Sequence, residues 1–193
     1  MKELNCIFVW GSGLYSSSRY YKFLFDGLPK DVTLSSIWKS KCLPKLKVFA
    51  WLLIMDRLNT RDMIQRRHWR LESGPNCVLC SDAHIETCDH FFLFCPFAQL
   101  CWSFLGIDWT ADYDIRRNIT VPSQHFSGPC FLETIVCAAW NIWKEQNDHI
   151  FQGSQPSLAR WKVRFQSDIM LHRYRVKQHL VQPLIDWLAE LFV

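Results

Sequence analysis

The chain has 193 residues, 49% hydrophobic and 21% charged, a composition typical of a folded globular protein and not of a disordered one. No apolar run reaches the ~18–20 residues that a membrane span needs, because charged residues interrupt every candidate segment. The nine cysteines follow no secretory signal, so they indicate reduced thiols or a metal site and not a disulfide framework.

The formal net charge of +4 conceals a strong segregation of charge along the chain. Residues 39–70 contain nine basic and two acidic side chains, residues 82–148 contain three basic and nine acidic ones, and residues 160–177 contain six basic and one acidic. A basic segment that also carries aromatic residues suits phosphate neutralisation combined with base stacking. The alternative is a solvated helix face that pairs with the acidic segment, and the sequence leaves both readings open.

The predicted fold is mainly α-helical. Residues 1–36 form an N-terminal segment of short extended pieces and turns that precedes the first domain. From Pro44 to about Arg57 the apolar residues recur near the helical period, and proline suits the first helical position. Thr60 is a candidate N-cap for a second helix with an arginine pair. We therefore expect a helical hairpin whose second arm is basic.

A domain over residues 37–105 ends, in this prediction, with a short helix over residues 97–105. Residues 106–130 contain two glycines and two prolines and predict an irregular linker. Residues 131–193 then form a C-terminal helical region, which gives the chain a second helical lobe.

Three helices are expected in this C-terminal region. Residues 131–150 have a strong helical pattern, and residues 157–177 predict a basic amphipathic helix. We expect the basic helix to pack on residues 131–150, although its basic face could instead dock a partner protein. Pro183 is expected to open the last helix.

A cysteine and histidine motif follows the hairpin. Cys77 and Cys80 enclose a tight turn, the usual first half of a structural zinc site. His90 and Cys95 supply the second half and complete the pattern C-x2-C-x9-H-x4-C. Zinc takes four nitrogen or sulfur donors at tetrahedral corners, and a closed set of four leaves no position for an activated water. The motif therefore predicts a structural Zn²⁺ site and not a hydrolytic one.

Two other residues compete for the histidine position. His84 and Cys88 both lie inside the nine-residue spacer, and each could replace His90. We prefer His90 because Phe91 and Phe92 beside it would pack against the site and exclude water. The predicted ligand set is Cys77, Cys80, His90 and Cys95.

The motifs occur in an order that is specific in combination. They are Ile37-Trp38-Lys39, Pro44-Lys45, Trp51-Leu52, Cys77, Cys80, Glu86-Thr87, Asp89-His90-Phe91-Phe92 and Cys95-Pro96-Phe97-Ala98. Together they resemble the reverse-transcriptase zinc-binding domain near the C-terminus of plant-type LINE (non-LTR) retrotransposon polyproteins. The resemblance extends upstream through Trp10, Gly13 and Tyr15–Tyr20, and downstream through Trp140–Phe151, where Gln146 replaces the usual arginine.

The resemblance implies a module that holds RNA or target DNA for reverse transcription. The chain itself contains no YxDD polymerase motif, Walker loop or GxSxG elbow, so we expect no catalytic activity. The polymerase and endonuclease of such an element would lie outside this chain. Zinc would then fix the loop against the hairpin, and the hairpin would present basic side chains to phosphates. These side chains are Lys45, Lys47, Arg61, Arg66, Arg67 and Arg70. Trp69 could stack on a base, although its pattern fits a half-buried tryptophan better.

The alternative hypothesis is a freestanding derivative of the element, co-opted to bind and interfere with a host protein. Neither hypothesis requires a membrane, and neither fixes the oligomeric state. We expect a nuclear or cytoplasmic protein. Residues 1–25 carry a few features of a mitochondrial transit peptide, but Gly11 and Gly13 break the helix that such a signal needs.

Overall fold

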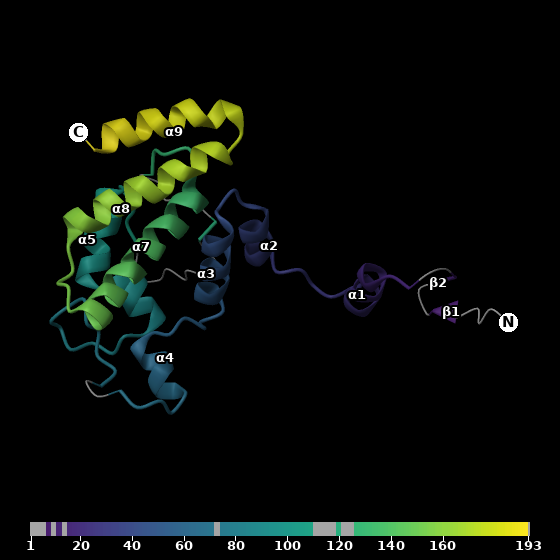
Figure 1. Cartoon of the computed structure of the whole chain (residues 1–193), viewed down its shortest axis with the longest axis horizontal. Coiled ribbons are helices and arrows are strands. Elements are labelled where there is room, and N and C mark those ends of the chain that lie inside the picture. Colours follow the sequence, from purple (N-terminus) through teal and green to yellow (C-terminus); the bar gives the residue numbers. More distant parts are fainter. Residues whose placement is uncertain are drawn as a thin grey trace. The chain divides into compact units, whose positions relative to one another are not determined.

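The computed structural model describes residues 7–8, 11–12, 15–71, 74–109, 119–120 and 126–192 (Figure 1). Over these residues the chain is mainly helical, as the sequence predicts. It divides into two compact units, residues 1–31 and 32–193. None of the described helices has the length and apolar character needed to cross a membrane.

The smaller unit contains two short strands and one helix. Strands β1 (Ile7–Phe8) and β2 (Gly11–Ser12) pair antiparallel, and helix α1 (Ser17–Phe25) follows. The hydroxyl of Ser16 caps α1 by accepting a hydrogen bond from the backbone N–H of Arg19 at 3.4 Å. The expectation of only extended pieces and turns before residue 36 is therefore wrong. No side chain of α1 is buried.

The larger unit begins with three helices, the second and third of which are the predicted arms of the hairpin. Helix α2 (Val32–Lys39) precedes α3 (Pro44–Ile54), whose apolar side chains enter the core, and α4 (Arg61–Arg66) forms the second arm. Helix α3 ends before Asp56, which has a left-handed backbone with φ of 49°. Thr60 is the N-cap of α4, as predicted, and accepts a hydrogen bond from the backbone N–H of Met63 at 3.3 Å.

The second half of this unit is also helical. A π-helix, η1 (His90–Phe94), leads directly into α5 (Pro96–Phe104). Helix α7 (Phe131–Gln152) is the longest and ends at Gly153, whose left-handed φ of 66° reverses the chain. Helix α8 (Leu158–Met170), a 3-10 turn η2 (Leu171–Tyr174) and α9 (Gln178–Leu191) complete the chain. Most of the predicted linker falls on residues 110–118 and 121–125, which lie outside the described residues.

Two predicted boundaries near the C-terminus are wrong. The basic helix expected over residues 157–177 ends at Met170, where the backbone tightens into η2. Helix α9 begins at Gln178, so Pro183 lies inside it and does not open it. The proline removes one hydrogen bond, the one to the carbonyl of His179, and both residues lie on the exposed side of the first two turns. This location makes the missing bond tolerable.

Helix α7 lies at the centre of the core. It packs against α3, α5 and α8, and its residues Ile135, Ala138, Ala139 and Ile142 are fully buried. Phe49 of α3 lies against two tryptophans of α7, with ring centroids 5.3 Å from Trp140 and 5.7 Å from Trp143. The hairpin and the C-terminal helices therefore share one hydrophobic core.

The acidic and basic segments meet between α7 and α8. Glu145 of α7 is 0% exposed, and Arg160 of α8 donates to both of its carboxylate oxygens at 2.9 and 2.5 Å. One turn further along each helix, Arg164 pairs with Asp148 at 2.5 Å. The expectation that the basic helix packs on residues 131–150 is confirmed. These two half-buried arginines are therefore paired with carboxylates of α7.

Candidate metal centre

A short loop over residues 75–86 carries the first two cysteines. A single antiparallel bridge joins Asn76 to Ile85 and closes the loop. The backbone N–H of Cys77 donates to the carbonyl of His84 at 2.8 Å, and that of Glu86 donates to the carbonyl of Pro75 at 2.9 Å. These bonds hold the turn that contains Cys77 and Cys80 in a fixed conformation.

The π-helix η1 positions the other two donors, because His90 is its first residue and Cys95 directly follows its last. The backbone N–H of Cys95 donates to the carbonyl of His90 at 2.6 Å, which spans five residues and defines the wide turn. The hydroxyl of Thr87 accepts a hydrogen bond from the backbone N–H of His90 at 3.1 Å and fixes the start of the turn. Cys95 is then the N-cap of α5, and Pro96 follows at the first helical position.

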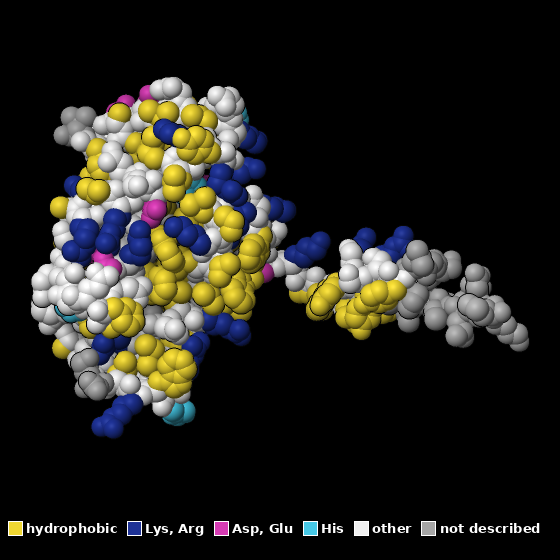
Figure 2. Space-filling view, viewed as in Figure 1, with side chains coloured by type: hydrophobic (Ala, Val, Ile, Leu, Met, Phe, Trp, Pro, Cys, Tyr) yellow, Lys and Arg dark blue, Asp and Glu magenta, His cyan; other side chains and the backbone are white. Residues whose placement is uncertain are grey.

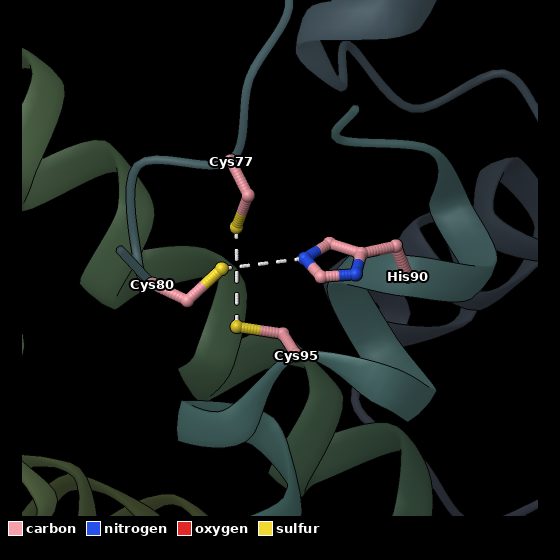
Figure 3. A group of neighbouring side chains, drawn as sticks. All are labelled: Cys77, Cys80, His90 and Cys95. Atoms are coloured by element: carbon pink, nitrogen blue, oxygen red, sulfur yellow. Dashed lines mark hydrogen bonds between the residues drawn. The ribbon is translucent and has the colours of Figure 1, made fainter. Parts of the chain in front are cut away.

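The four predicted ligands converge on one point, as Figure 3 shows. The donor atoms of Cys77, Cys80, His90 and Cys95 all lie within 4.8 Å of one another. The Sγ atoms of Cys77 and Cys95 are 3.9 Å apart, and Cys80 Sγ is 3.5 Å from Nε2 of His90. Donors bound tetrahedrally at zinc distances are ~3.8 Å apart for two thiolates and ~3.6 Å apart for a thiolate and an imidazole. The cluster therefore has the dimensions of a tetrahedral metal site.

The protonation chemistry of the cluster also suits a metal. The hydrogen bond from the Cys77 thiol lowers the pKa of Cys95 to about 6, and the N–H groups of Ala98 and Phe97 at the start of α5 act in the same direction. Burial lowers the pKa of His90, which favours the neutral imidazole that a metal requires. Cys95 is thus the first thiolate of the set, and metal binding would release the proton of Cys77.

The two competing residues lie outside the cluster. His84 is exposed, and its ring centroid is 5.2 Å from that of His90, while its carbonyl holds Cys77. The Sγ atom of Cys88 points to the carbonyl of Leu53 at 4.0 Å. Within the described residues, the converging set is the one that the spacing predicts.

Buried Glu86 connects the metal loop to the rest of the unit. Its side chain is 0% exposed and accepts hydrogen bonds from the backbone N–H groups of Arg61 at 3.0 Å and Val78 at 3.4 Å. The side-chain amide of Gln146, on α7, also donates to it. Burial raises the pKa of Glu86 to about 7. Glu86 belongs to the motif that carries the resemblance, but nothing in its sequence pattern indicates this buried role.

Arg61 requires a correction. We expected it to face phosphates, but it is 5% exposed, and its guanidinium donates to the carbonyl of Gly74 from Nε at 3.0 Å and from Nη2 at 2.5 Å. Its position at the start of α4 places it against the metal loop. Arg61 therefore anchors the loop from the interior and cannot contact a nucleic acid.

The other predicted phosphate contacts separate into two groups. Lys45 and Lys47 lie in the first turn of α3, and Nζ of Lys47 donates to the carbonyl of Trp38 in α2 at 2.7 Å. The second group, Arg66, Arg67 and Arg70, lies at and beyond the end of α4. The length of α3, 11 residues or ~16 Å, separates the groups, so the hairpin does not present one continuous basic stripe.

The end of the hairpin is only partly basic. Arg66 pairs with Asp56 at 3.0 Å and with Asp62 at 2.7 Å, so two carboxylates offset its charge. Arg67 and Arg70 are exposed, and Nη1 of Arg67 donates to the side chain of Asn59 at 2.9 Å. Trp69 is 60% exposed and not half-buried as its pattern suggested.

Comparison with known proteins agrees with this geometry. Residues 15–102 match the family model described as zinc-binding in reverse transcriptase. No curated protein and no solved structure matches the chain. The matched residues include the whole C-x2-C-x9-H-x4-C motif and the hairpin that packs beside it, and the plant-type LINE origin stays a prediction. Residues 15–102 are therefore similar to the zinc-binding domains of reverse transcriptases.

Proposed function

We propose that Cys77, Cys80, His90 and Cys95 hold one Zn²⁺ ion in a structural site. The single observation that supports this proposal most strongly is the convergence of three thiols and one imidazole within 4.8 Å. Sulfur-rich sets of four donors select zinc over magnesium or calcium, which prefer oxygen ligands. Because all four positions are filled by protein, the ion would stabilise the fold and would not activate water.

We also propose that the domain binds RNA or DNA and has no catalytic activity of its own. Two features support this: the family match to a part of reverse transcriptases, and the cations at both ends of the hairpin, all exposed except the half-buried Lys47. Lys45 and Lys47 lie at one end, and Arg66, Arg67 and Arg70 at the other, beside the exposed ring of Trp69. Contacts of this kind give salt-sensitive binding with little sequence preference.

The test is fluorescence anisotropy with labelled single-stranded RNA and DNA over a range of salt concentrations. Arg66→Glu/Arg67→Glu is expected to weaken binding and to reduce its salt dependence. The matched control, Arg66→Lys/Arg67→Lys, keeps both charges and is expected to bind within a few-fold of the natural chain. Equal affinity of the Glu and Lys variants would contradict a role for this end of the hairpin, and absence of any binding by the natural chain would contradict the function itself.

One observation favours the alternative, a protein-interaction factor. Helix α1 exposes a set of large apolar side chains, and Figure 2 shows them on one side of the helix with basic side chains on the other. They are Tyr20, Tyr21, Phe23, Leu24 and Phe25. A helix of nine residues is too short to be stable in isolation, so such a face is typical of a helix that packs against another surface.

The alternative predicts a complex that survives high salt and nuclease treatment. Phe23→Ser/Leu24→Ser is expected to abolish it, and Arg66→Glu/Arg67→Glu is expected to leave it intact. The nucleic-acid function predicts the opposite pattern, so the two variants distinguish the two functions.

A further inference from the structure

The two basic segments of the sequence meet at one place in the structure. Nε of Arg175, in the turn between α8 and α9, donates to the carbonyl of Lys41, between α2 and α3, at 3.0 Å. The two residues are separated by 134 positions in the chain. We call the surface formed around this contact the junction surface, and define it by Trp38, Lys39, Lys41, Arg173, Tyr174, Arg175 and Lys177.

The junction surface is exposed and strongly basic. All seven of its residues are exposed, and residues 38–47 and 171–185 contain seven lysines and arginines and no acidic residue. Figure 2 shows dark blue Lys and Arg side chains beside α2 and the start of α9. The carboxylate of Glu133, which is half-buried, accepts a hydrogen bond from the backbone N–H of Lys41 at 2.8 Å.

These cations differ from Arg66, Arg160 and Arg164 in having no ion pair with a carboxylate. Arg160 and Arg164 pair with carboxylates of α7, and Arg66 pairs with two carboxylates of its own hairpin. Among the residues that the structure describes, no ion pair involves the side chains of the junction surface. Apart from Glu133 beside Lys41, no carboxylate contact offsets their positive charge within the described residues, and such a charge attracts phosphates.

Two aromatic side chains accompany the charges. Trp38 is 50% exposed, and its carbonyl is fixed by Nζ of Lys47. Tyr174 is 71% exposed, and the guanidinium of Arg173 lies 4.5 Å from the centre of its ring. Exposed aromatic rings among cations are the combination that stacks unpaired bases while the phosphates are neutralised.

We propose that the junction surface binds single-stranded nucleic acid and supplies a larger part of the binding energy than the hairpin end. This inference rests on the proposed nucleic-acid function. It assigns that function to a surface made of two distant segments, one of which, residues 173–177, lies beyond the matched family domain.

The experiment compares two variants with equal changes in charge. The junction variant is Lys39→Gln/Lys41→Gln/Arg173→Gln/Lys177→Gln, which leaves the contact made by Arg175 intact. The hairpin variant is Arg57→Gln/Arg66→Gln/Arg67→Gln/Arg70→Gln. Each phosphate contact on a single strand contributes a slope of ~0.7 in log affinity against log salt, or ~5-fold in affinity between about 1 M and 0.1 M salt. Loss of four contacts would therefore reduce affinity by up to about 600-fold and the slope by about 2.8.

The proposal predicts a markedly larger loss for the junction variant than for the hairpin variant. An equal or larger loss for the hairpin variant would overturn it while leaving the nucleic-acid function in place. If the natural chain shows no salt-dependent binding, the proposed function itself fails, and the inference fails with it. The outcomes are thus distinguishable.

A single substitution guards against misfolding of the fourfold variant. Tyr174→Leu keeps an apolar side chain at an exposed position and removes the ring. Base stacking on one aromatic ring is worth about 5- to 150-fold in affinity, so this variant is expected to lose that much for single-stranded RNA or DNA. Duplex DNA, whose bases are already stacked, should be unaffected. Equal affinity of Tyr174→Leu and the natural chain for single strands would overturn the stacking role.

Discussion

Replacing Cys95 by serine tests the metal centre most directly. Cys95 is 0% exposed and is both a predicted metal donor and the N-cap of α5. Serine is among the best N-cap residues, so the substitution preserves the start of the helix and removes only the thiolate. Any large effect therefore reports on the metal and not on the backbone.

The expected loss of zinc-binding free energy follows from the number of donors. Structural zinc sites have apparent binding free energies of roughly 10–16 kcal/mol, so one of four equal donors accounts for about 3–4 kcal/mol. This corresponds to a loss of roughly 150- to 900-fold in zinc affinity. Since the net stability of a domain is only about 5–15 kcal/mol, the temperature of unfolding should fall as well.

The measurement is a competition titration against a chromogenic zinc chelator, combined with thermal unfolding followed by circular dichroism. The matched control is Cys88→Ser, which changes a half-buried thiol that faces the carbonyl of Leu53 and lies outside the cluster. It should bind zinc within a few-fold of the natural chain. Similar zinc affinities for the two variants, or a larger loss for Cys88→Ser, would refute the assignment.

Three further predictions concern the buried charges. Arg160→Gln removes the bidentate partner of the buried Glu145 and should lower the free energy of unfolding, measured in urea, by about 3 kcal/mol. Lys144→Gln breaks a more exposed ion pair and should lower the free energy of unfolding by less than about 1 kcal/mol. Arg61→Lys keeps the charge but cannot reproduce both hydrogen bonds to the Gly74 carbonyl, so urea unfolding should show a loss of about 1–2 kcal/mol. Burial raises the pKa of Glu86 from 4.5 to about 7, so the folded state favours the protonated form, and its stabilising contribution is present below the unfolded pKa and lost as pH rises to 7. With zinc in excess, raising the pH from 4.5 to above 7 should therefore lower the free energy of unfolding of the natural chain by up to about 3 kcal/mol relative to that of Glu86→Gln. A difference in unfolding free energy that stays constant with pH would contradict this sign.

The metal ligands could be predicted because each half of the site is local. A C-x2-C turn and an H-x4-C turn each bring two donors together within a few residues, whatever the rest of the fold does. The sequence did not reveal that the second turn is a π-helix, in which the N–H of Cys95 reaches the carbonyl of His90. The spacing alone was enough to place the side chains of His90 and Cys95 in one coordination sphere.

The roles of Arg61 and Glu86 could not be predicted because their partners are distant in sequence. Glu86 lies 25 residues from Arg61 and 60 residues from Gln146 in the sequence. An arginine within a basic segment is predicted to be a surface charge when only its sequence neighbours are considered. The same reason explains the separation of Lys45 and Lys47 from Arg66 and its neighbours. Charge counted along the chain does not show which cations the fold neutralises.

The matched domain packs against residues that lie outside the matched segment. The family match ends at residue 102, yet Phe49 of the hairpin packs on Trp140 and Trp143, and Glu86 beside the metal loop receives the amide of Gln146. All three of these partners lie on α7. Gln146 is a neutral amide, so it supplies a hydrogen bond to Glu86 but no positive charge. The metal loop is therefore held from outside the matched segment, by a hydrogen bond that favours the ionised form of Glu86, while burial of the carboxyl opposes its ionisation.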